Sequence, residues 1–212
     1  MANIFLTIKT DTSHELVIKK SRFICHLKKI ASEEEAREFI SATGQAHRKA
    51  NHNCFAYLIG DHDEIQRESD NGEPSGTAGV PILEALQKRG LHNVCAVVTR
   101  YFGGIKLGAG GLIRAYSNVT STAIEEAGIV QRITQTILSI EVPYKLHDQL
   151  LYYLQQIPLE IADESYAVNV TTQVYIDNDQ IQTVIDDLTS RFNDQLTLTP
   201  GEERQHEVPY NE

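Results

Sequence analysis

The sequence predicts an α+β protein of two domains, and three observations support this prediction. Charge divides the chain, because residues 1–130 carry 15 Lys/Arg and 15 Asp/Glu whereas residues 131–212 carry 4 and 14. Both parts interleave alternating apolar segments, typical of strands, with segments of helical periodicity. The second part follows the order β-α-β-β-α-β of a ferredoxin-like domain. We therefore expect domains at residues 1–132 and 133–205, followed by a frayed tail at residues 206–212.

The first domain begins with a strand pair, a capped helix and a hairpin. Residues 14–25 alternate in the manner of two paired strands. Ser32 and Glu35 have the spacing of a capping box, which predicts a helix starting beside Ser32. Residues 54–59 and 65–68 predict a second pair of strands that turn through a polar tetrapeptide.

Two strand-to-helix units complete the first domain. A helix is expected over residues 79–89, with Gly90 as the residue that follows its C-cap. Residues 94–99 form a continuous apolar run, which is typical of a central strand buried on both faces. A long helix with apolar residues at helical spacing then ends at Gly128.

The second domain is expected to contain four strands and two helices. The strands are predicted at residues 134–142, 157–163, 166–176 and 195–203, and the helices at residues 145–156 and 177–192. Asp177 is the expected N-cap of the second helix, because aspartate accepts hydrogen bonds from the first free N–H groups.

Composition favours an ordinary globular protein located in the cytoplasm. Of the 212 residues, 41% are hydrophobic and 23% are charged. No apolar run is long enough to span a membrane, and no secretory leader pattern is present at the N-terminus. Cys25, Cys54 and Cys95 lack metal-binding spacing and indicate reduced, buried thiols, with Cys54 and His52 as an alternative reactive pair. We expect no membrane partner and no cofactor.

Two glycine-rich loops, residues 69–79 and 100–111, are the strongest candidate site. Glycine clusters indicate a close approach to the backbone, and both loops lead into a helix N-terminus that favours an anion. The candidate anion- or ligand-binding residues are Glu73, Ser75, Gly76, Thr77, Arg100, Gly103, Gly104, Lys106, Gly108, Gly110 and Gly111.

The chemistry of these loops leaves two interpretations open. Arg100 and Lys106 would supply positive charge to a phosphate or carboxylate. Alternatively, the glycines only permit tight packing, and Arg100 pairs with Glu73 or Asp70. Asp70 and Glu73 are also weak candidates for a Mg²⁺ site, although both could equally cap or solvate the loop. That the two loops meet in space is an expectation.

Familiar catalytic and phosphate-binding motifs are excluded by particular residues. Ala109 stands where a Walker A loop requires lysine, and Ile113 stands where a dinucleotide fingerprint requires a small residue. Glu73 and Thr77 replace the glycines of a nucleophile elbow around Ser75. No catalytic residue is assigned.

The segments at residues 70–79 and 100–108 resemble the Impact/YigZ family in its bacterial two-domain form, and the resemblance extends over nearly the whole chain. It implies an N-terminal domain like the second domain of ribosomal protein S-five and a C-terminal domain similar to the last domain of elongation factor G. Eukaryotic Impact proteins regulate translation initiation, and the same N-terminal fold also serves in small-molecule kinases.

These observations together predict a non-catalytic regulator associated with translation. Its anion site would bind RNA, the ribosome or a translation-associated protein, and its acidic domain would contact a protein. One alternative is a nucleotide-binding protein or Mg-dependent enzyme that holds a phosphate-containing small ligand in the same loops. Another is a protein-interaction scaffold in which the loops are purely architectural.

Overall fold

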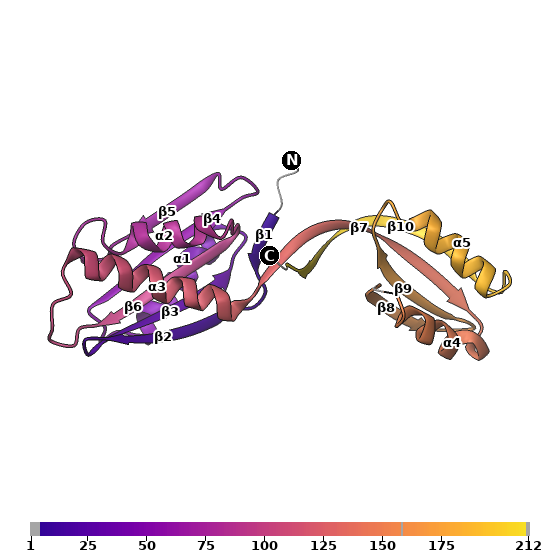
Figure 1. Cartoon of the computed structure of the whole chain (residues 1–212), viewed down its shortest axis with the longest axis horizontal. Coiled ribbons are helices and arrows are strands. Elements are labelled where there is room, and N and C mark those ends of the chain that lie inside the picture. The colour runs from indigo at the N-terminus through magenta and orange to yellow at the C-terminus, as the bar shows by residue number, and fades with distance from the viewer. Residues whose placement is uncertain (1–4, 158, 211–212) are drawn as a thin grey trace. The chain divides into compact units, whose positions relative to one another are not determined.

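The computed structural model describes residues 5–157 and 159–210, and the chain forms two compact units (Figure 1). Unit 1 contains Met1–Arg132 together with Glu207–Glu212, and unit 2 contains Ile133–His206. The predicted two-domain α+β architecture is confirmed. No helix within the described ranges is long and apolar enough to cross a membrane.

Unit 1 is built on a five-stranded antiparallel sheet with helices on both faces. The strand order is β2-β3-β6-β4-β5. The elements are β2 (Thr12–Ile18), β3 (Ser21–Lys29), α1 (Glu33–Ala46), β4 (His52–Ile59), β5 (Ile65–Ser69), α2 (Gly79–Lys88), β6 (Val94–Tyr101) and α3 (Ala109–Ala127).

The central strand β6 is buried on both faces, as its apolar run predicts. Val94, Ala96 and Val98 pack with α2 and α3 on one face of the sheet. Cys95 and Val97 pack on the other face, in the cluster to which α1 contributes. The sheet therefore holds the starts of α2 and α3, which follow the two glycine-rich loops, on the same side.

The local signals in unit 1 are confirmed. The Glu35 N–H donates to Ser32 Oγ at 3.3 Å, and the Glu35 carboxylate accepts from the Ala31 N–H at 2.8 Å. Gly90 follows the C-cap of α2 with φ +62°, and Gly128 caps α3. Both pairs of predicted strands form, β2 with β3 and β4 with β5.

Unit 1 also contains β1 (Phe5–Ile8), which pairs with residues 129–132 of β7 (Ile129–Val142). The predicted frayed tail from residue 206 is wrong for the described residues. Strand β10 (Thr197–Pro209) continues past residue 206, and the Tyr210 N–H donates to the Ile129 carbonyl at 3.1 Å. Backbone pairing orders this segment, which its polar composition had not indicated; residues 211 and 212 of the predicted tail lie outside the described residues.

Unit 2 has the predicted ferredoxin-like order of elements. After β7 come α4 (Tyr144–Leu154), β8 (Ile161–Tyr166), β9 (Val170–Ile176), α5 (Ile181–Arg191) and β10. The strands lie in the order β10-β7-β9-β8, which is the split pattern of this fold. Leu150, Leu154 and Leu188 cover the sheet from the two helices.

Several boundaries predicted for unit 2 are wrong. The strand predicted over residues 157–163 is β8, which begins at Ile161, because Ile157 and Leu159 pack on the core from a turn rather than from a paired strand. Residue 158 of that prediction lies outside the described residues. The next strand, β9, begins at Val170 and not at residue 166, since residues 167–169 turn the chain.

Asp177 is not the N-cap of α5. Its carboxylate accepts a hydrogen bond from the Gln135 side chain at 2.9 Å, and its carbonyl accepts from the Gln180 N–H in a turn. The helix begins four residues later, at Ile181, with Gln180 as the N-cap. The hydrogen bond from Gln135 of β7 engages the Asp177 carboxylate that the local sequence predicted to cap the helix.

Candidate functional site

The first glycine-rich loop closes on its own aspartate. The Asp70 carboxylate accepts backbone N–H hydrogen bonds from Gly76 at 2.7 Å and from Ala78 and Gly79 at 2.9 Å each. Partial burial raises the pKa of Asp70, but the N–H donors of Gly76, Gly79 and Ala78 outweigh it, so the pKa lies below its ordinary value. The N-terminus of α2 is thus neutralised from inside the loop.

This closure corrects the anion site expected at the start of α2. The Thr77 hydroxyl donates to the Pro74 carbonyl at 2.6 Å, and Thr77 is buried. Ser75 is exposed. Asp70 is held by backbone donors, and no cluster of potential metal ligands occurs in the part of the chain that the structure describes. The loop carries its own anion where a ligand had been expected.

Glu73 points out of the first loop and joins it to the second. Its Oε1 accepts hydrogen bonds from Arg100 Nη1 at 2.5 Å and from the Tyr116 hydroxyl at 2.8 Å. Its Oε2 lies 3.9 Å from His52 Nε2. The Glu73 and Arg100 side chains are 3% and 7% exposed. Of the two carboxylates considered as partners of Arg100, the structure selects Glu73.

Arg100 lies at the end of β6 with much of its guanidinium unused. Its guanidinium carbon lies 5.2 Å from the centre of the Phe23 ring and 5.6 Å from that of Phe102. Its Nε is buried without a hydrogen-bond partner among the described residues. A guanidinium has five N–H donors, and Glu73 uses the Nη1 side alone.

His52 extends the network from the start of β4. Its Nδ1 lies 2.9 Å from the Asn71 carbonyl oxygen. Because a carbonyl oxygen only accepts, this contact places a hydrogen on Nδ1 and leaves Nε2 on the side of Glu73. The antiparallel register of β4 and β6 sets His52 opposite Arg100.

The second loop is held by its backbone but leaves its helix uncapped. The Phe102 N–H donates to the Asn51 side-chain oxygen at 2.8 Å, and the Gly103 N–H donates to Ser21 Oγ at 3.1 Å. A Cβ on Gly103 would overlap the Lys20 carbonyl group, so close packing explains this glycine. Gly108, which has no side chain, is the N-cap of α3 with φ +72°, and among the described residues no side chain accepts a hydrogen bond from the first N–H groups of this helix.

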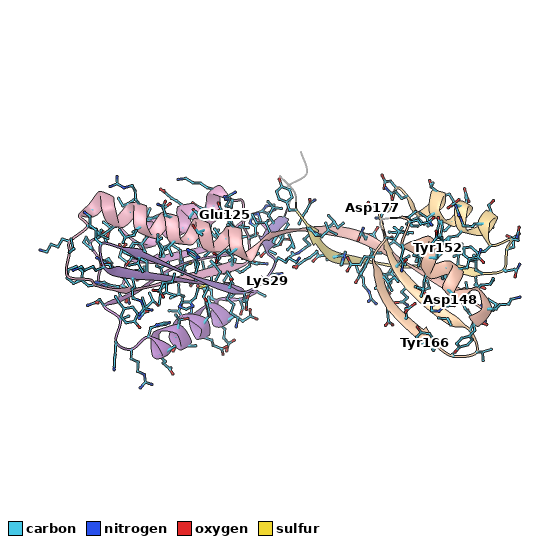
Figure 2. The ribbon with its side chains drawn as sticks, turned by 60° about the horizontal axis from the view of Figure 1, so that its bottom comes forward. Lys29, Glu125, Asp148, Tyr152, Tyr166 and Asp177 are labelled. Carbon is cyan, nitrogen blue, oxygen red and sulfur yellow. The ribbon has the colours of Figure 1, made fainter. Side chains whose placement is uncertain are left out.

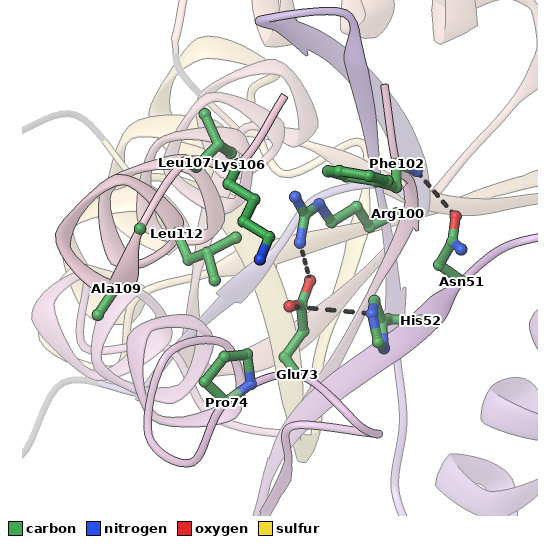
Figure 3. Close-up of a pocket in the computed structure, with 11 residues that line it drawn as sticks. Asn51, His52, Glu73, Pro74, Arg100, Phe102, Lys106, Leu107, Ala109 and Leu112 are labelled. Carbon is green, nitrogen blue, oxygen red and sulfur yellow. Dashed lines mark hydrogen bonds and ion pairs between the residues drawn. The ribbon is translucent and has the colours of Figure 1, made fainter. Parts of the chain in front are cut away.

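The two loops meet around a cavity of about 420 Å³ (Figure 3). Of the predicted site residues, it brings together Glu73, Arg100, Lys106 and Gly108. The cavity is lined by Asn51, His52, Glu73, Pro74, Arg100, Phe102, Lys106, Leu107, Gly108, Ala109 and Leu112. The predicted residues that do not line it are Ser75, Gly76, Thr77, Gly103, Gly104, Gly110 and Gly111.

Charge in the cavity is unevenly balanced. Arg100 and Glu73 offset each other, whereas Lys106 has no acidic partner in the described chain. Figure 3 shows the Lys106 side chain extending toward the Arg100 and Glu73 pair. The uncapped start of α3 adds a partial positive charge, because its first N–H groups have no partner within the helix. The cavity therefore suits an anion.

Sequence reasoning gave too little weight to Asn51, His52 and Phe102. Their positions depend on the β4 and β6 register and on the contact between Asn51 and the Phe102 backbone. The available signals were the polar Asn51-His52 pair directly before an apolar strand and the aromatic Tyr101-Phe102 pair, which could stack on a base or form part of a pocket wall. Register between distant strands cannot be read from such a local pattern.

The three cysteines are buried and free, as predicted. Burial raises the pKa of the Cys25 and Cys54 thiols to about 12 each. Cys54 lies next to the site and its thiol donates to the Asp70 carbonyl at 2.9 Å. Since the thiolate is the nucleophilic form, this raised pKa argues against the alternative of a reactive Cys54–His52 pair.

Comparison with known proteins agrees with the resemblance seen in the loops. Residues 19–124 match the Impact N-terminal domain, and residues 140–195 match a domain of unknown function, DUF1949. IMPACT family member YvyE of Bacillus subtilis is 43% identical over 202 residues, covering 95% of this chain and 93% of that protein. The Protein IMPACT homolog of Schizosaccharomyces pombe is 34% identical over 100 residues, or 45% of this chain and 35% of that protein.

A solved structure described as that of a hypothetical protein covers 95% of this chain and 99% of its own, with 29% identity and a TM-score of 0.60. The sequence matches extend through both units, and YvyE of Bacillus subtilis is similar along almost its whole length. This protein therefore belongs to the IMPACT family.

Proposed function

We propose that this protein is a non-catalytic regulator associated with translation that binds RNA or a ribosome-associated partner through the cavity of unit 1. The carrying observation is the cavity itself, where Lys106, the free side of Arg100 and the uncapped start of α3 face one space. Such an arrangement attracts phosphate groups. The resemblance to Impact proteins, some of which regulate translation initiation, supplies the biological context.

The site favours binding over catalysis. The adjacent Cys54 thiol is protonated at neutral pH because burial raises its pKa to about 12. Glu73 is engaged by Arg100 and Tyr116, and Asp70 by backbone N–H groups. These contacts stabilise the two loops and leave cationic and N–H donor groups to meet a ligand.

Unit 2 is proposed to contact a protein with a basic surface. Residues 133–206 contain 3 Lys/Arg and 12 Asp/Glu, a formal net charge of −9. This charge repels a phosphate backbone and attracts cationic surfaces. Figure 2 shows Asp148, Tyr152 and Tyr166 among the side chains of this unit, and the two tyrosines are 66% and 60% exposed. The two units thus have opposite preferences in binding.

The test is RNA and ribosome binding by the whole chain as a function of salt. A labelled structured RNA should bind with an affinity that falls as salt rises. Lys106→Gln should weaken binding and reduce the slope of log affinity against log salt by about 1, because one phosphate contact is lost. Lys88→Gln is the matched control, since Lys88 is exposed on α2 away from the cavity. Absence of binding, binding that ignores salt, or equal effects of the two variants would contradict the proposal.

A further inference from the structure

The cavity is concave and partly apolar, and binding an internal phosphate of an RNA backbone requires neither property. A volume of about 420 Å³ is that of a small-molecule site. Besides its charged groups, the cavity is lined by the apolar side chains of Pro74, Phe102, Leu107 and Leu112. A ligand that fits must therefore combine an anionic group with an apolar or planar part.

Phe102 is a fixed but exposed aromatic ring at this cavity. Its backbone N–H is held by Asn51, while 45% of the residue remains exposed. Figure 3 shows the ring beside the Arg100 guanidinium. An aromatic ring with an accessible face is the kind of platform on which nucleobases stack.

The anionic end of the ligand would meet the cationic groups deeper in the site. The Arg100 side chain is 7% exposed, and its buried Nε has no hydrogen-bond partner among the described residues. Lys106 lines the same space. A planar guanidinium presents paired donors to phosphate oxygens, and the ammonium adds a point charge. The site has two cations and a helix N-terminus but the single carboxylate of Glu73. This excess of positive charge favours a terminal phosphate, which carries more negative charge than an internal phosphodiester.

We propose that the cavity binds a terminal nucleoside monophosphate, either a free nucleotide or the phosphorylated end of an RNA, with its base on Phe102 and its phosphate between Arg100, Lys106 and the start of α3. This inference deepens the proposed function and rests on the cavity of unit 1 being its binding site. A phosphate monoester at a chain end can enter a concave site, whereas an internal phosphodiester is flanked by nucleotides on both sides.

The experiment compares one short single-stranded RNA with a 5′-phosphate, with a 3′-phosphate and with neither, each titrated against the full chain. We expect one phosphorylated form to bind at least about tenfold more tightly than the hydroxyl form. Lys106→Gln should abolish that difference, and Lys88→Gln should retain it. Equal affinity of all three RNAs, together with no detectable binding of adenosine monophosphate, would overturn the inference, while salt-dependent binding of the same RNAs would leave the proposed function standing.

Competition with adenosine monophosphate separates the two sources of the ligand. Displacement of phosphorylated RNA by the nucleotide at similar concentration indicates a free nucleotide, and much weaker displacement indicates an RNA end. If the nucleotide binds but no RNA or ribosome does, the inference stands and the RNA-binding part of the proposed function fails. Tighter binding of an acidic peptide than of the nucleotide would overturn the nucleotide assignment.

Phe102→Leu tests the stacking platform while keeping an apolar side chain at the rim. We expect it to weaken adenosine monophosphate binding several-fold and to leave inorganic phosphate binding unchanged, because in the proposed complex the ring meets the base and not the phosphate. An unchanged midpoint of thermal unfolding shows that the variant is folded. Equal nucleotide affinity in the variant and the parent would remove Phe102 from the site.

Discussion

The two glycine-rich loops look alike in sequence, but they differ in whether a side chain of the protein accepts hydrogen bonds from the N-terminus of the helix that follows. In the first, the Asp70 carboxylate accepts the free N–H groups at the start of α2. In the second, the N-cap of α3 is Gly108, no side chain in the described part of the chain caps the helix, and Lys106 lines the adjacent cavity. One loop is closed by an internal anion and the other remains available to an external one. A glycine-rich loop before a helix therefore indicates an anion, but the anion can be part of the protein.

Removing the connection between the loops should have the largest effect. Arg100→Leu leaves the Glu73 carboxylate buried without its cationic partner. Loss of one member of a buried ion pair costs about 3–5 kcal/mol, so the free energy of unfolding should fall by this amount. Urea denaturation measures it.

Arg22→Leu is the control, because the Arg22–Glu15 pair is exposed and an exposed ion pair contributes little to stability. Equal effects of the two substitutions would show that the buried pair does not hold the loops together.

Removing the internal anion should have the next largest effect. Asp70→Ala leaves three backbone N–H groups without their acceptor and should destabilise the protein by about 2–4 kcal/mol. Asp61→Ala is the control, because the Asp61 side chain is 67% exposed. A stability loss below about 0.5 kcal/mol for Asp70→Ala would contradict the description of the first loop as closed by this residue.

The same carboxylate predicts how stability depends on pH. The pKa of Asp70 is lowered from its ordinary value of 3.8 in the folded state, so the unfolded chain binds more protons between the two values. Its stabilising contribution is present in full above the unfolded-state pKa and is lost as pH falls through the folded-state pKa. The difference in unfolding free energy between the parent and Asp70→Ala should therefore shrink in acid below pH 3.8. A difference that stays constant would contradict this sign.

Gly103→Ala should have a smaller destabilising effect. The added methyl group would meet the backbone of Lys20, so the loop must shift against the turn between β2 and β3. Overpacking of this kind costs about 1–3 kcal/mol. Thermal denaturation would show it, and an unchanged melting temperature would mean that the second loop moves freely at this point.

Gly110→Ala should change stability least, and in the opposite direction. A Cβ there has no neighbour within 4 Å, and the backbone of Gly110 does not have positive φ. Alanine in the helix should raise stability by up to about 1 kcal/mol. If RNA binding weakens while stability rises, this glycine serves a ligand at the start of α3. Lower stability would show a packing role that the geometry does not indicate.

Much of the fold was predictable because its signals are local. The capping residue Ser32, the C-terminal glycines Gly90 and Gly128 and the doubly buried strand β6 depend on periodicity and backbone preference within a few residues. The errors occurred where distant contacts overrode such preferences. The Asp177 carboxylate accepts a hydrogen bond from Gln135 and does not cap α5, and residues 206–209 were ordered by strand pairing.

By itself, the sequence determined the two-domain α+β architecture, the order of the elements after β1 and the acidic character of residues 133–206, and it indicated two glycine-rich loops as the candidate site. The tertiary structure decided that the loops meet, that Glu73 and not Asp70 pairs with Arg100, and that His52 and Phe102 join them. The physical reason is the separation along the chain of the residues that each property involves. Periodicity, capping and charge are properties of neighbouring residues, whereas strand register and the choice of a buried ion partner arise only when segments far apart in the chain pack together.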